Sequence, residues 1–449
     1  MRQKDIKYSG EYPGKENTML HTNLSVNEKG NLTFAGQDCT LLAKEYKTPL
    51  YLLDEERIRE KCRIYVNAMK KHFGEASFPL YASKALSFKG IYKIVCEEEM
   101  GVDVVSGGEL YTAFSAGFPM EKVFFHGNSK SEEEISFAIE KGIGFFVADC
   151  REELEEINAV AKKKGIKQKI ILRLTPGIDT HTYEAVRTGQ VDSKFGTAIE
   201  TGQAFEITKF ALSLENIDLK GFHCHVGSQV FDGQSFCDSA DIMLDFIAYV
   251  KKEIGYTASI LNLGGGYGVR YVESDPVLDI EKSIGEVACH IKEKCAQNNL
   301  EMPSILLEPG RSIVADAGLT LYKVRSVKTI TGYKSYVAID GGMTDNPRYA
   351  LYGSKYSACI ANKASEPSDF LCTIAGKCCE SGDLIAEEIM LQKPAKDDIL
   401  AVMVTGAYNY SMASNYNRIP RPPIVILNKG ESKIAVKRES YENLLVNDI

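Results

Sequence analysis

The chain has no long apolar run. No uninterrupted stretch of about 18 apolar residues occurs in its 449 residues, so the sequence predicts no membrane-spanning helix. The N-terminal stretch MRQKDIKYSGEYPGKENT is polar and has no apolar centre of the kind that a secretory signal peptide needs. We therefore expect a cytoplasmic protein with no membrane partner.

Cys-x-x-Cys spacing is also missing, although the chain contains 12 cysteines. In the expected cytoplasmic setting these thiols should be reduced. Two of them are adjacent, Cys378 and Cys379 in GKCCESGD, and no second Cys or His cluster follows them. Structural zinc is therefore not expected there, and we expect no bound metal. From spacing alone, the pair is either two ordinary thiols or the edge of an active site.

Basic residues are outnumbered by acidic ones. The net charge is −8 and the isoelectric point is about 5.6, which argues against nucleic acid as a partner. A small anionic ligand would need basic residues gathered locally.

Short apolar runs alternate with charged, helix-like stretches from about residue 79 to residue 310. Eight runs are expected to be strands: PLYAS (79–83), VDVVS (102–106), VFFHG (123–127), FFVAD (145–149), IILRLTP (170–176), GFHCHVG (221–227), ILNLGGG (260–266) and ILLEPG (305–310). Between them, REELEEINAVAKKKG (151–165) has the acidic start, lysine-rich end and final glycine of a helix. Eight such units predict a (β/α)8 barrel.

Polar or glycine residues lie at the C-terminal end of every expected strand, where barrel active sites are built. They are Lys84, Ser106, His126, Asp149, Arg173, His225, Gly264 to Gly266, and Glu308. A doubly wound open sheet is the alternative, but it would concentrate its site at one switch point.

The alternation of strand-like and helix-like segments ends after Arg311. LTLYKVRSVKTI (319–330), YVAIDGG (336–342), FLCTIAG (370–376) and PPIVIL (422–427) resemble strands without regular helices between them, which predicts an all-β domain of the sandwich or barrel type. We expect residues 1–50 to join this β domain, residues 51–315 to form the barrel, and residues 316–449 to form the β domain itself.

Lys84 ends the first expected strand. A lone lysine there commonly extends into solvent, but a partly desolvated amine can form a Schiff base. HCHVGS (223–228) places His223 and His225 on one face of the sixth strand. Such a pair can bind metal, as in metal-dependent barrel hydrolases, or one histidine can stack on an aromatic ligand. The motif alone leaves both interpretations open.

LGGGYG (263–268) ends the seventh strand, where glycines let backbone N–H groups approach an anion closely. Barrel phosphate sites commonly follow strands seven and eight, and Ser228 could add a hydroxyl donor. Glu308 ends the eighth strand in EPGR (308–311). It could form a structural salt bridge, or it could favour the protonated ring nitrogen of pyridoxal phosphate. A lysine, a histidine, glycines and a glutamate together suit that cofactor.

At these residues the chain resembles the barrel-type (fold type III) pyridoxal-phosphate decarboxylases and, among them, the diaminopimelate decarboxylases. The resemblance extends from TPLYLLD (48–54) to GAYNYSMASNYN (406–417). Further motifs make it specific: DSKFG (192–196), FHCHVGSQ (222–229), NPRYALYG (346–353) and CESGD (379–383). It implies decarboxylation of meso-2,6-diaminopimelate to L-lysine and CO2, the last step of lysine biosynthesis.

The resemblance also implies roles for individual residues. Lys84 would carry pyridoxal 5'-phosphate as a Schiff base, His225 would stack on its ring and Glu308 would pair with the ring nitrogen. The phosphate would be held by Ser228, Gly265, Gly266 and Gly310. The substrate's distal carboxylate would be gripped by Arg311, which also lies at the cofactor, and by Arg348, with help from Tyr352. Glu380 would serve the distal ammonium, and Tyr408 would lie beside both cofactor and substrate.

Cys379 would, by the same resemblance, reach into the site of a neighbouring subunit and donate a proton after CO2 leaves. This implies a homodimer with active sites shared across the interface. Cys378 stands where the family often has histidine, and we expect no required role for it.

Other functions remain open at this stage. A related decarboxylase of D-lysine, D-ornithine or a carboxylated polyamine is the nearest, although simple diamino acids have no distal carboxylate for Arg348. An alanine-racemase-like enzyme usually has arginine in place of Glu308. A metal-dependent hydrolase using His223 and His225 would give Glu308 and the glycines no joint role, and a non-catalytic pyridoxal-phosphate carrier would not need Cys379.

Overall fold

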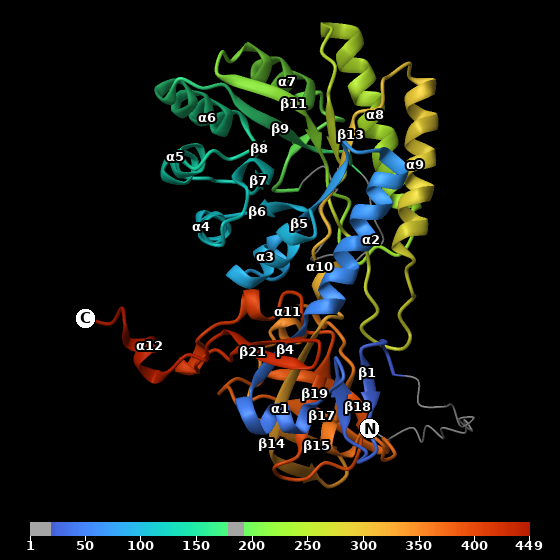
Figure 1. The fold of residues 1–449 in the computed structure, drawn as a ribbon, viewed down its shortest axis with the longest axis vertical. Helices are drawn as coiled ribbons and strands as arrows, with labels where there is room; N and C mark the ends of the chain where they lie inside the picture. Colours follow the sequence, from blue (N-terminus) through green and yellow to red (C-terminus); the bar gives the residue numbers. More distant parts are fainter. Residues whose placement is uncertain (1–18, 178–192) are drawn as a thin grey trace, which may run out of the picture.

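We describe the protein from a computed structural model, which covers residues 19–177 and 193–449. The polar stretch 1–18 and Asp192 of the DSKFG motif lie outside the described residues. The chain forms a helix-covered barrel and a smaller β-rich domain, which Figure 1 shows above and below one another.

Eight parallel strands within the described residues close into a barrel, as predicted. They are β5 (Phe78–Ala82), β6 (Gly101–Val104), β7 (Val123–Phe125), β8 (Phe145–Ala148), β9 (Gln168–Thr175), β11 (Ile217–His223), β12 (Ile260–Asn262) and β13 (Ser304–Leu307). Pairing of β13 with β5 and of β8 with β9 completes the circle. A two-residue strand, β10 (Thr197–Ala198), adds to the end of β9.

Helices follow the barrel strands in turn and cover the barrel from outside (Figure 1). They are α3 (Lys89–Glu97), α4 (Gly107–Ser115), α5 (Glu132–Glu140), α6 (Arg151–Lys164), α7 (Gln203–Ser213), α8 (Gln234–Ile254), α9 (Ile280–Gln297) and the short α10 (Arg311–Val314). The helix expected over 151–165 is α6, and Gly165 ends it at φ 66°. That left-handed angle suits glycine, which has no Cβ to clash.

Apolar side chains fill the barrel interior below the strand ends. One buried cluster is formed by Leu80, Phe124, Val147, Ile171 and Leu306, which come from five different barrel strands. The Phe124 ring stacks on that of Phe145, with centroids 4.4 Å apart. Because this end of the barrel is plugged, a ligand has room only toward the C-terminal ends of the strands.

The second domain is built on a nine-stranded sheet within the part of the chain that the structure describes. Its members are β4 (Leu50–Asp54), β14 (Gly318–Ile330), β15 (Lys334–Ile339), β16 (Ala358–Ile360), β17 (Phe370–Ala375), β18 (Leu384–Leu391), β19 (Ile399–Met403), β20 (Ile424–Asn428) and β21 (Glu431–Val436). Four strands, β16, β18, β19 and β21, were not expected from the sequence.

The N-terminal segment joins this domain, as expected. Strands β1 (Leu24–Val26), β2 (Leu32–Phe34) and β3 (Gln37–Asp38) form a small sheet beside α1 (Cys39–Tyr46). Next, β4 pairs antiparallel with β14 and parallel with β20.

Helix α2 (Glu55–Phe73) then leads from the β domain to the barrel. Its N-terminus is capped by Asp54, whose carboxylate accepts a hydrogen bond from Arg57 N. The long strand β14 returns to the β domain after α10. The chain therefore crosses between the domains at least twice.

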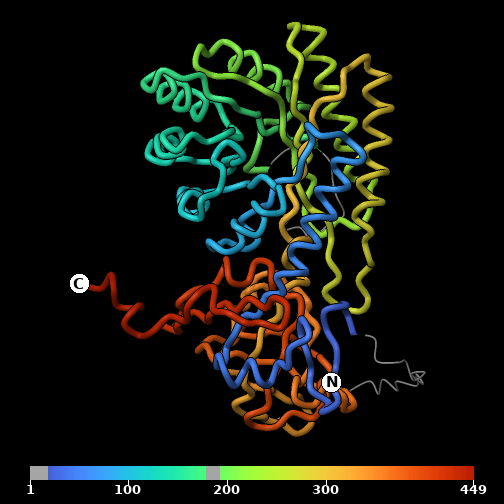
Figure 2. The backbone as a smooth tube through the Cα atoms, in the orientation of Figure 1, coloured from blue at the N-terminus to red at the C-terminus, as the bar shows by residue number. Residues whose placement is uncertain are grey.

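The remaining elements lie at the domain boundary and near the C-terminus. Helix α11 (Arg348–Tyr352) belongs to the β domain, and α12 (Tyr441–Leu445) lies on a C-terminal segment that extends away from the body (Figure 2). No helix in the described ranges has the length and apolar character needed to cross a membrane.

Candidate active site

Lys84 lies in a short 3-10 turn, Ser83–Ala85, directly after β5. It borders a cavity of about 300 Å³ that Arg173, His225 and Glu308 also line. These four residues come from four different strand ends of the barrel. Barrel closure therefore brings three of the expected cofactor residues, Lys84, His225 and Glu308, to one place.

The charge of Lys84 depends on its neighbours. Burial lowers the pKa of its ammonium group, but the Asp103 carboxylate, the Tyr408 hydroxyl and the Glu308 carboxylate act in the opposite direction, and the net result is a raised pKa. Lys84 is therefore held as a cation in a cavity that Glu308 also lines. Its side chain stays open to the cavity, as a group that must react with a cofactor has to be.

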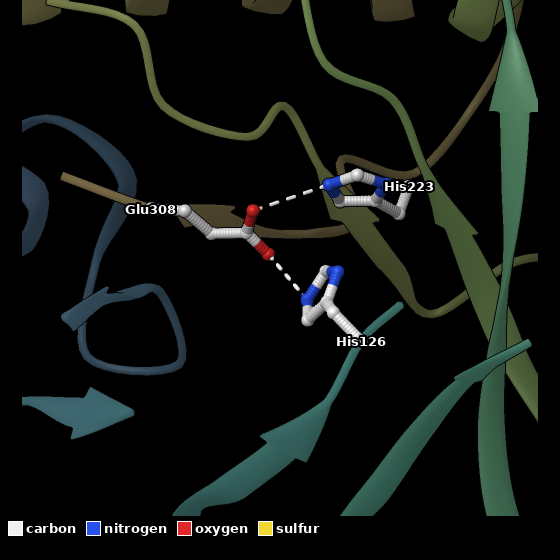
Figure 3. A group of neighbouring side chains, drawn as sticks. All are labelled: His126, His223 and Glu308. Atoms are coloured by element: carbon white, nitrogen blue, oxygen red, sulfur yellow. Dashed lines mark hydrogen bonds and ion pairs between the residues drawn. The ribbon is translucent and has the colours of Figure 1, made fainter. Parts of the chain in front are cut away.

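Glu308 lies in a buried cluster with His126 and His223 (Figure 3). One carboxylate oxygen, Oε1, accepts a hydrogen bond from Asn262 Nδ2 at 2.7 Å and lies 2.7 Å from His126 Nε2. The other, Oε2, lies 3.2 Å from His223 Nε2. Burial raises the pKa of Glu308, but His126 and His223 outweigh it and hold the pKa well below its ordinary value. Glu308 is therefore an anion.

The three side chains of this cluster are also of types that bind metals, and their ligand atoms lie within 4.8 Å of one another. The 3.2 Å contact of His223 is a hydrogen bond to the carboxylate, and the 2.7 Å contact of His126 is an ion-pair contact with it. With Asn262, Glu308 has three polar partners in the protein. We therefore interpret the cluster as a polar network around a carboxylate.

His223 and His225 separate into two environments. His223 points at Glu308, while Nδ1 of His225 accepts a hydrogen bond from Gly265 N at 3.3 Å. Burial lowers the pKa of His223 to about 4 and, with the positive charges of Lys84 and Arg173, lowers that of His225 well below its ordinary value. Both rings are neutral near pH 7. Both rings line the cavity at Lys84, but the group of possible metal ligands among the described residues includes His223 and not His225, as the metal-hydrolase interpretation would need.

Close backbone packing explains the glycines after β12. A Cβ on Gly265 would lie 2.1 Å from the carbonyl oxygen of Glu308, and one on Gly266 would lie 2.4 Å from that of Gly227. Gly266 also has φ +120°, which L-residues rarely adopt. Gly310 is similarly tight, because a Cβ there would approach Ala82 to 2.9 Å. Only glycine lets these backbone segments meet at the end of the barrel.

Arg311 connects this glycine-rich end to the β domain. Its guanidinium donates to Ser228 Oγ and to the Tyr271 hydroxyl, both at 2.8 Å. Its Cζ lies 4.8 Å from the centroid of the Tyr408 ring. Ser228 and Arg311, expected at the phosphate and at the substrate, are therefore direct neighbours.

Arg348 approaches the same tyrosine from the β domain. Its Cζ lies 5.4 Å from the ring centroids of both Tyr408 and Tyr352. Both arginines are buried, and neither Arg311 Nε nor Arg348 Nε has a hydrogen-bond partner among the described residues. Buried donors without partners are costly, so these two suit an anionic ligand.

Tyr408 itself is tied to the lysine-bearing turn. Its backbone N–H donates to Ala85 O at 2.7 Å, and its φ of 61° is unusual for a residue with a side chain. The loop after β19 therefore places Tyr408 beside Lys84 and the two arginines. Strained backbone of this kind clusters at functional sites.

Cys379 and Glu380 are not brought to this cavity within one chain. Both are exposed, and neither lines the cavity at Lys84. Cys379 N donates to Asn417 Oδ1 at 2.7 Å, which fixes the loop. Cys378 is buried instead, and burial together with Asp383 raises the pKa of its thiol to about 11. The two adjacent cysteines therefore have opposite surroundings.

Sequence reasoning assigned no function to three residues that shape the site: Asn262, His126 and Asp103. Asn262 donates to Glu308 and accepts from Gly264 N at 2.9 Å. Asp103 is buried beside His126, at 3.9 Å. His126 carried a signal, because it ends its strand with a polar side chain. Asp103 and Asn262 stand inside apolar strand runs, where a polar residue is itself the signal.

Residues 55–315 match the family described as pyridoxal-dependent decarboxylase, pyridoxal binding domain. The diaminopimelate decarboxylase of Bacillus methanolicus is 46% identical over 420 residues, which cover 94% of this chain and 97% of that protein. That of Bacillus subtilis (strain 168) is 44% identical over 430 residues, covering 96% and 98%. A crystal structure of diaminopimelate decarboxylase from M. jannaschii with L-lysine has a TM-score of 0.89 at 34% identity, covering 96% and 99%.

The site fits pyridoxal phosphate on its own geometry. A lysine and a carboxylate border one cavity, tight glycine backbones lie beside it, and two buried guanidinium groups have unpartnered donors. These are the groups that a Schiff base, a ring nitrogen and anionic ligands require. The cofactor is pyridoxal phosphate, and this chain belongs to the diaminopimelate decarboxylase family of pyridoxal-dependent decarboxylases.

Proposed function

We propose that this chain converts meso-diaminopimelate into L-lysine and CO2, with Arg311 and Arg348 gripping the distal carboxylate of the substrate. The observation that carries this proposal is the approach of both buried guanidinium groups to the Tyr408 ring, each with an unpartnered Nε. Two buried cations side by side need an anion to offset their burial and repulsion. A diamino acid with a second carboxylate provides that anion, and a simple diamino acid does not.

When bound, pyridoxal phosphate withdraws electrons from the bond that breaks. The chain's own residues hold and tune it: Lys84 carries it, Glu308 supplies negative charge for the ring nitrogen, and the neutral ring of His225 stacks on it. The phosphate is held by Ser228, Gly265, Gly266, Gly310 and, through its contact with Ser228, Arg311. The very low pKa of Glu308 supports its part, because only an anion stabilises a protonated ring nitrogen.

Substrate orientation follows from the arginines. Arginine contacts with a carboxylate are often bidentate and therefore fix direction as well as position. Arg311 and Arg348 anchor the far end of the substrate, with the Tyr352 and Tyr408 rings packed beside them. Anchoring at the far end aims the carboxylate that is lost, and this is a rate contribution from positioning.

The proton that replaces CO2 comes from Cys379 of a second copy of the chain. Its exposure supports this arrangement. Glu380, the next residue, serves the substrate's distal ammonium. The active unit is therefore a homodimer with two shared sites.

We also propose the division into residues 1–50, 51–315 and 316–449 as the domain organisation, with the first segment joined to the last and with one correction: β4 (Leu50–Asp54) pairs with β14 and β20, so residues 51–54 belong to the β domain. The family match over residues 55–315 supports the barrel part. A cytoplasmic location, expected from the sequence, stays a prediction.

Purified protein with added pyridoxal phosphate tests the proposed function directly. CO2 release and lysine formation would be measured with meso-diaminopimelate, D-lysine, D-ornithine and a carboxylated polyamine in parallel. We expect stoichiometric CO2 and L-lysine from diaminopimelate and little turnover of the others. Turnover of D-lysine or D-ornithine without turnover of diaminopimelate would disprove the substrate while leaving the cofactor intact.

A further inference from the structure

Glu308 is surrounded by more polar partners than an ion pair with the cofactor requires. Asn262 and His126 share Oε1, at 2.7 Å each, and His223 faces Oε2 at 3.2 Å. Asn262, His126 and His223 lie at the ends of β12, β7 and β11, so the three partners come from three different strands of the barrel. All four residues are buried. The barrel thus fixes this carboxylate from several sides.

His126 differs from the other two partners, because its Nε2 lies between two carboxylates. Glu308 Oε1 is 2.7 Å away and Asp103 Oδ1 is 3.9 Å away (Figure 3 shows the Glu308 contact). A bare ring nitrogen facing two carboxylates would be repelled by both, so Nε2 carries a proton. The shorter contact, with Glu308, is an ion-pair contact, because Nε2 does not meet the angle of a hydrogen bond to either carboxylate.

Asp103 places a second buried carboxylate next to His126. Its Oδ1 has no hydrogen-bond partner among the described residues, although the side chain is 1% exposed. Burial raises the pKa of Asp103 to about 6, with Glu308 adding to the rise while His126 and Lys84 oppose it. Asp103 is therefore a second acidic group beside Nε2 of His126.

The contribution of His126 becomes clear from the effect that burial alone would have on the charge of Glu308. A carboxylate out of water favours its neutral form. A neutral Glu308 would leave the cofactor's ring nitrogen without a counter-charge. The pKa of Glu308 is low because His126 and His223 overcome burial, and His126 makes the shorter contact of the two.

We propose that His126 is a positioning residue that acts through Glu308: the 2.7 Å contact of its Nε2 with Oε1 holds that oxygen, and so keeps the carboxylate charged and aimed at the cofactor's ring nitrogen. The inference rests on the proposed function, in which Glu308 pairs with that nitrogen. His126 itself does not contact the substrate in this account.

Other charged groups also act on this carboxylate and its partners, and any pH effect includes them. Those that act on Glu308, His223 or Asp103 are Lys84, Arg173 and Glu109, in addition to His126 itself. The test therefore reads the ring nitrogen directly rather than a pH profile of activity.

The test uses the full chain reconstituted with pyridoxal phosphate labelled with nitrogen-15 in the ring, observed by NMR. The variants are His126→Leu and His126→Met, which lack a donor, and His126→Gln, which keeps an N–H of similar reach. His290→Leu is the matched control, because His290 pairs with Asp241 on the half-exposed surface of α9. Cofactor uptake and circular dichroism report folding.

We expect the protonated ring-nitrogen signal in the wild type, in His126→Gln and in His290→Leu. In His126→Leu and His126→Met the signal should move toward that of the unprotonated ring. In the same variants kcat should fall about 10- to 100-fold, as for the loss of a hydrogen bond to a charged group, while KM stays nearly unchanged. In a double variant with Glu308→Gln, His126→Leu should lower kcat little further, because both changes remove the same interaction between Glu308 and the ring nitrogen.

An unchanged ring-nitrogen signal in a folded His126→Leu or His126→Met variant would overturn the inference. So would a shifted signal in His126→Gln, which also serves as the deciding variant if neither donor-free variant folds. An unchanged signal in Glu308→Gln would instead show that Glu308 does not pair with the ring nitrogen. That outcome counts against the proposed function and is distinguishable from a failure of His126 alone.

Discussion

The guanidinium carbon of Arg348 lies 5.4 Å from the centroid of the Tyr408 ring, although the two residues are 60 positions apart in the chain. Tyr408 also contacts Arg311 and is hydrogen-bonded through its backbone to Ala85, next to Lys84. One ring therefore connects the proposed substrate grip in the β domain with the proposed cofactor lysine in the barrel. The two domains are in contact at this residue.

Replacing the Tyr408 ring tests that connection. Tyr408→Ala removes the surface against which both arginines pack, and cation–π contacts are worth about 0.5 to 2 kcal/mol each. We expect kcat/KM for diaminopimelate to fall about 10- to 100-fold, mostly through KM. Tyr408→Phe keeps the ring and should lose far less. The exposed Tyr333→Ala serves as control, and equal losses in Tyr408→Phe and Tyr408→Ala would contradict a packing role.

A mixing experiment tests the shared sites. Lys84→Ala and Cys379→Ala should each be nearly inactive, because one lacks the proposed cofactor lysine and the other the proposed proton donor. If each site combines Lys84 of one chain with Cys379 of another, a mixed dimer regains one intact site. We expect the mixture to recover about a quarter of wild-type activity after subunit exchange, from random pairing of equal amounts. Activity that stays at the level of the separate variants would place both residues in one chain.

The glycine backbone makes a prediction about cofactor binding. In Gly265→Ala the new Cβ would lie 2.1 Å from the Glu308 carbonyl oxygen, so the backbone has to move. We expect a loss of stability of about 1 to 3 kcal/mol, as for overpacking, and weaker binding of pyridoxal phosphate. Calorimetry and cofactor titration measure the two effects. Gly430→Ala is the control, because Gly430 has φ +84° but no atom lies within 4 Å of the added Cβ. It shows the effect of an added methyl group that has no steric clash and lies away from the site.

Much of the barrel and of its site could be predicted because each strand is a short apolar run that ends in a polar residue or glycine. Lys84, His225 and Glu308 end three such runs, and parallel strands bring those ends together. The partners of Glu308 are different. Asn262 and His126 contact Glu308 because the folded barrel brings three different strand ends together. The spacing of these residues in the sequence does not predict how far apart they lie in the fold.

The β domain was harder to predict for a local reason. Between Ile389 and Ala386, strand β18 has two residues opposite one residue of β17, and one of them, Glu388, has φ 50°. This bulge interrupts the two-residue alternation by which strands are recognised. Two adjacent glutamates in LIAEEIML therefore do not suggest a strand, although β18 spans Leu384–Leu391.

The ionisation of Asp345 should make the stability of the folded protein depend on pH. It is 1% exposed, and burial raises its pKa to about 7, above the ordinary value near 3.9. The folded state therefore holds the proton more tightly than the unfolded state does. Stability is greatest below about pH 4 for this group and falls as the pH rises through 7, by about 4 kcal/mol in all.

Asp345→Asn removes this ionisation while it keeps an oxygen for the hydrogen bonds from Gly342 N and the Thr344 hydroxyl. We expect the variant to gain stability relative to the wild type as the pH rises from 4 to 8, in urea unfolding at several pH values. The exposed Asp397→Asn should show no such trend. A constant difference between Asp345→Asn and wild type would show that Asp345 ionises normally.

The most direct test of the account compares kcat/KM for meso-diaminopimelate and for D-lysine in the wild type and in Arg348→Ala, with Arg325→Ala as a surface control. D-Lysine lacks the distal carboxylate, so removal of Arg348 should lower kcat/KM for diaminopimelate about 100-fold or more and leave the slow D-lysine rate nearly unchanged. The preference for diaminopimelate should therefore collapse. Equal losses for the two substrates, or a wild type that prefers D-lysine, would contradict the proposed grip of Arg348 on the distal carboxylate.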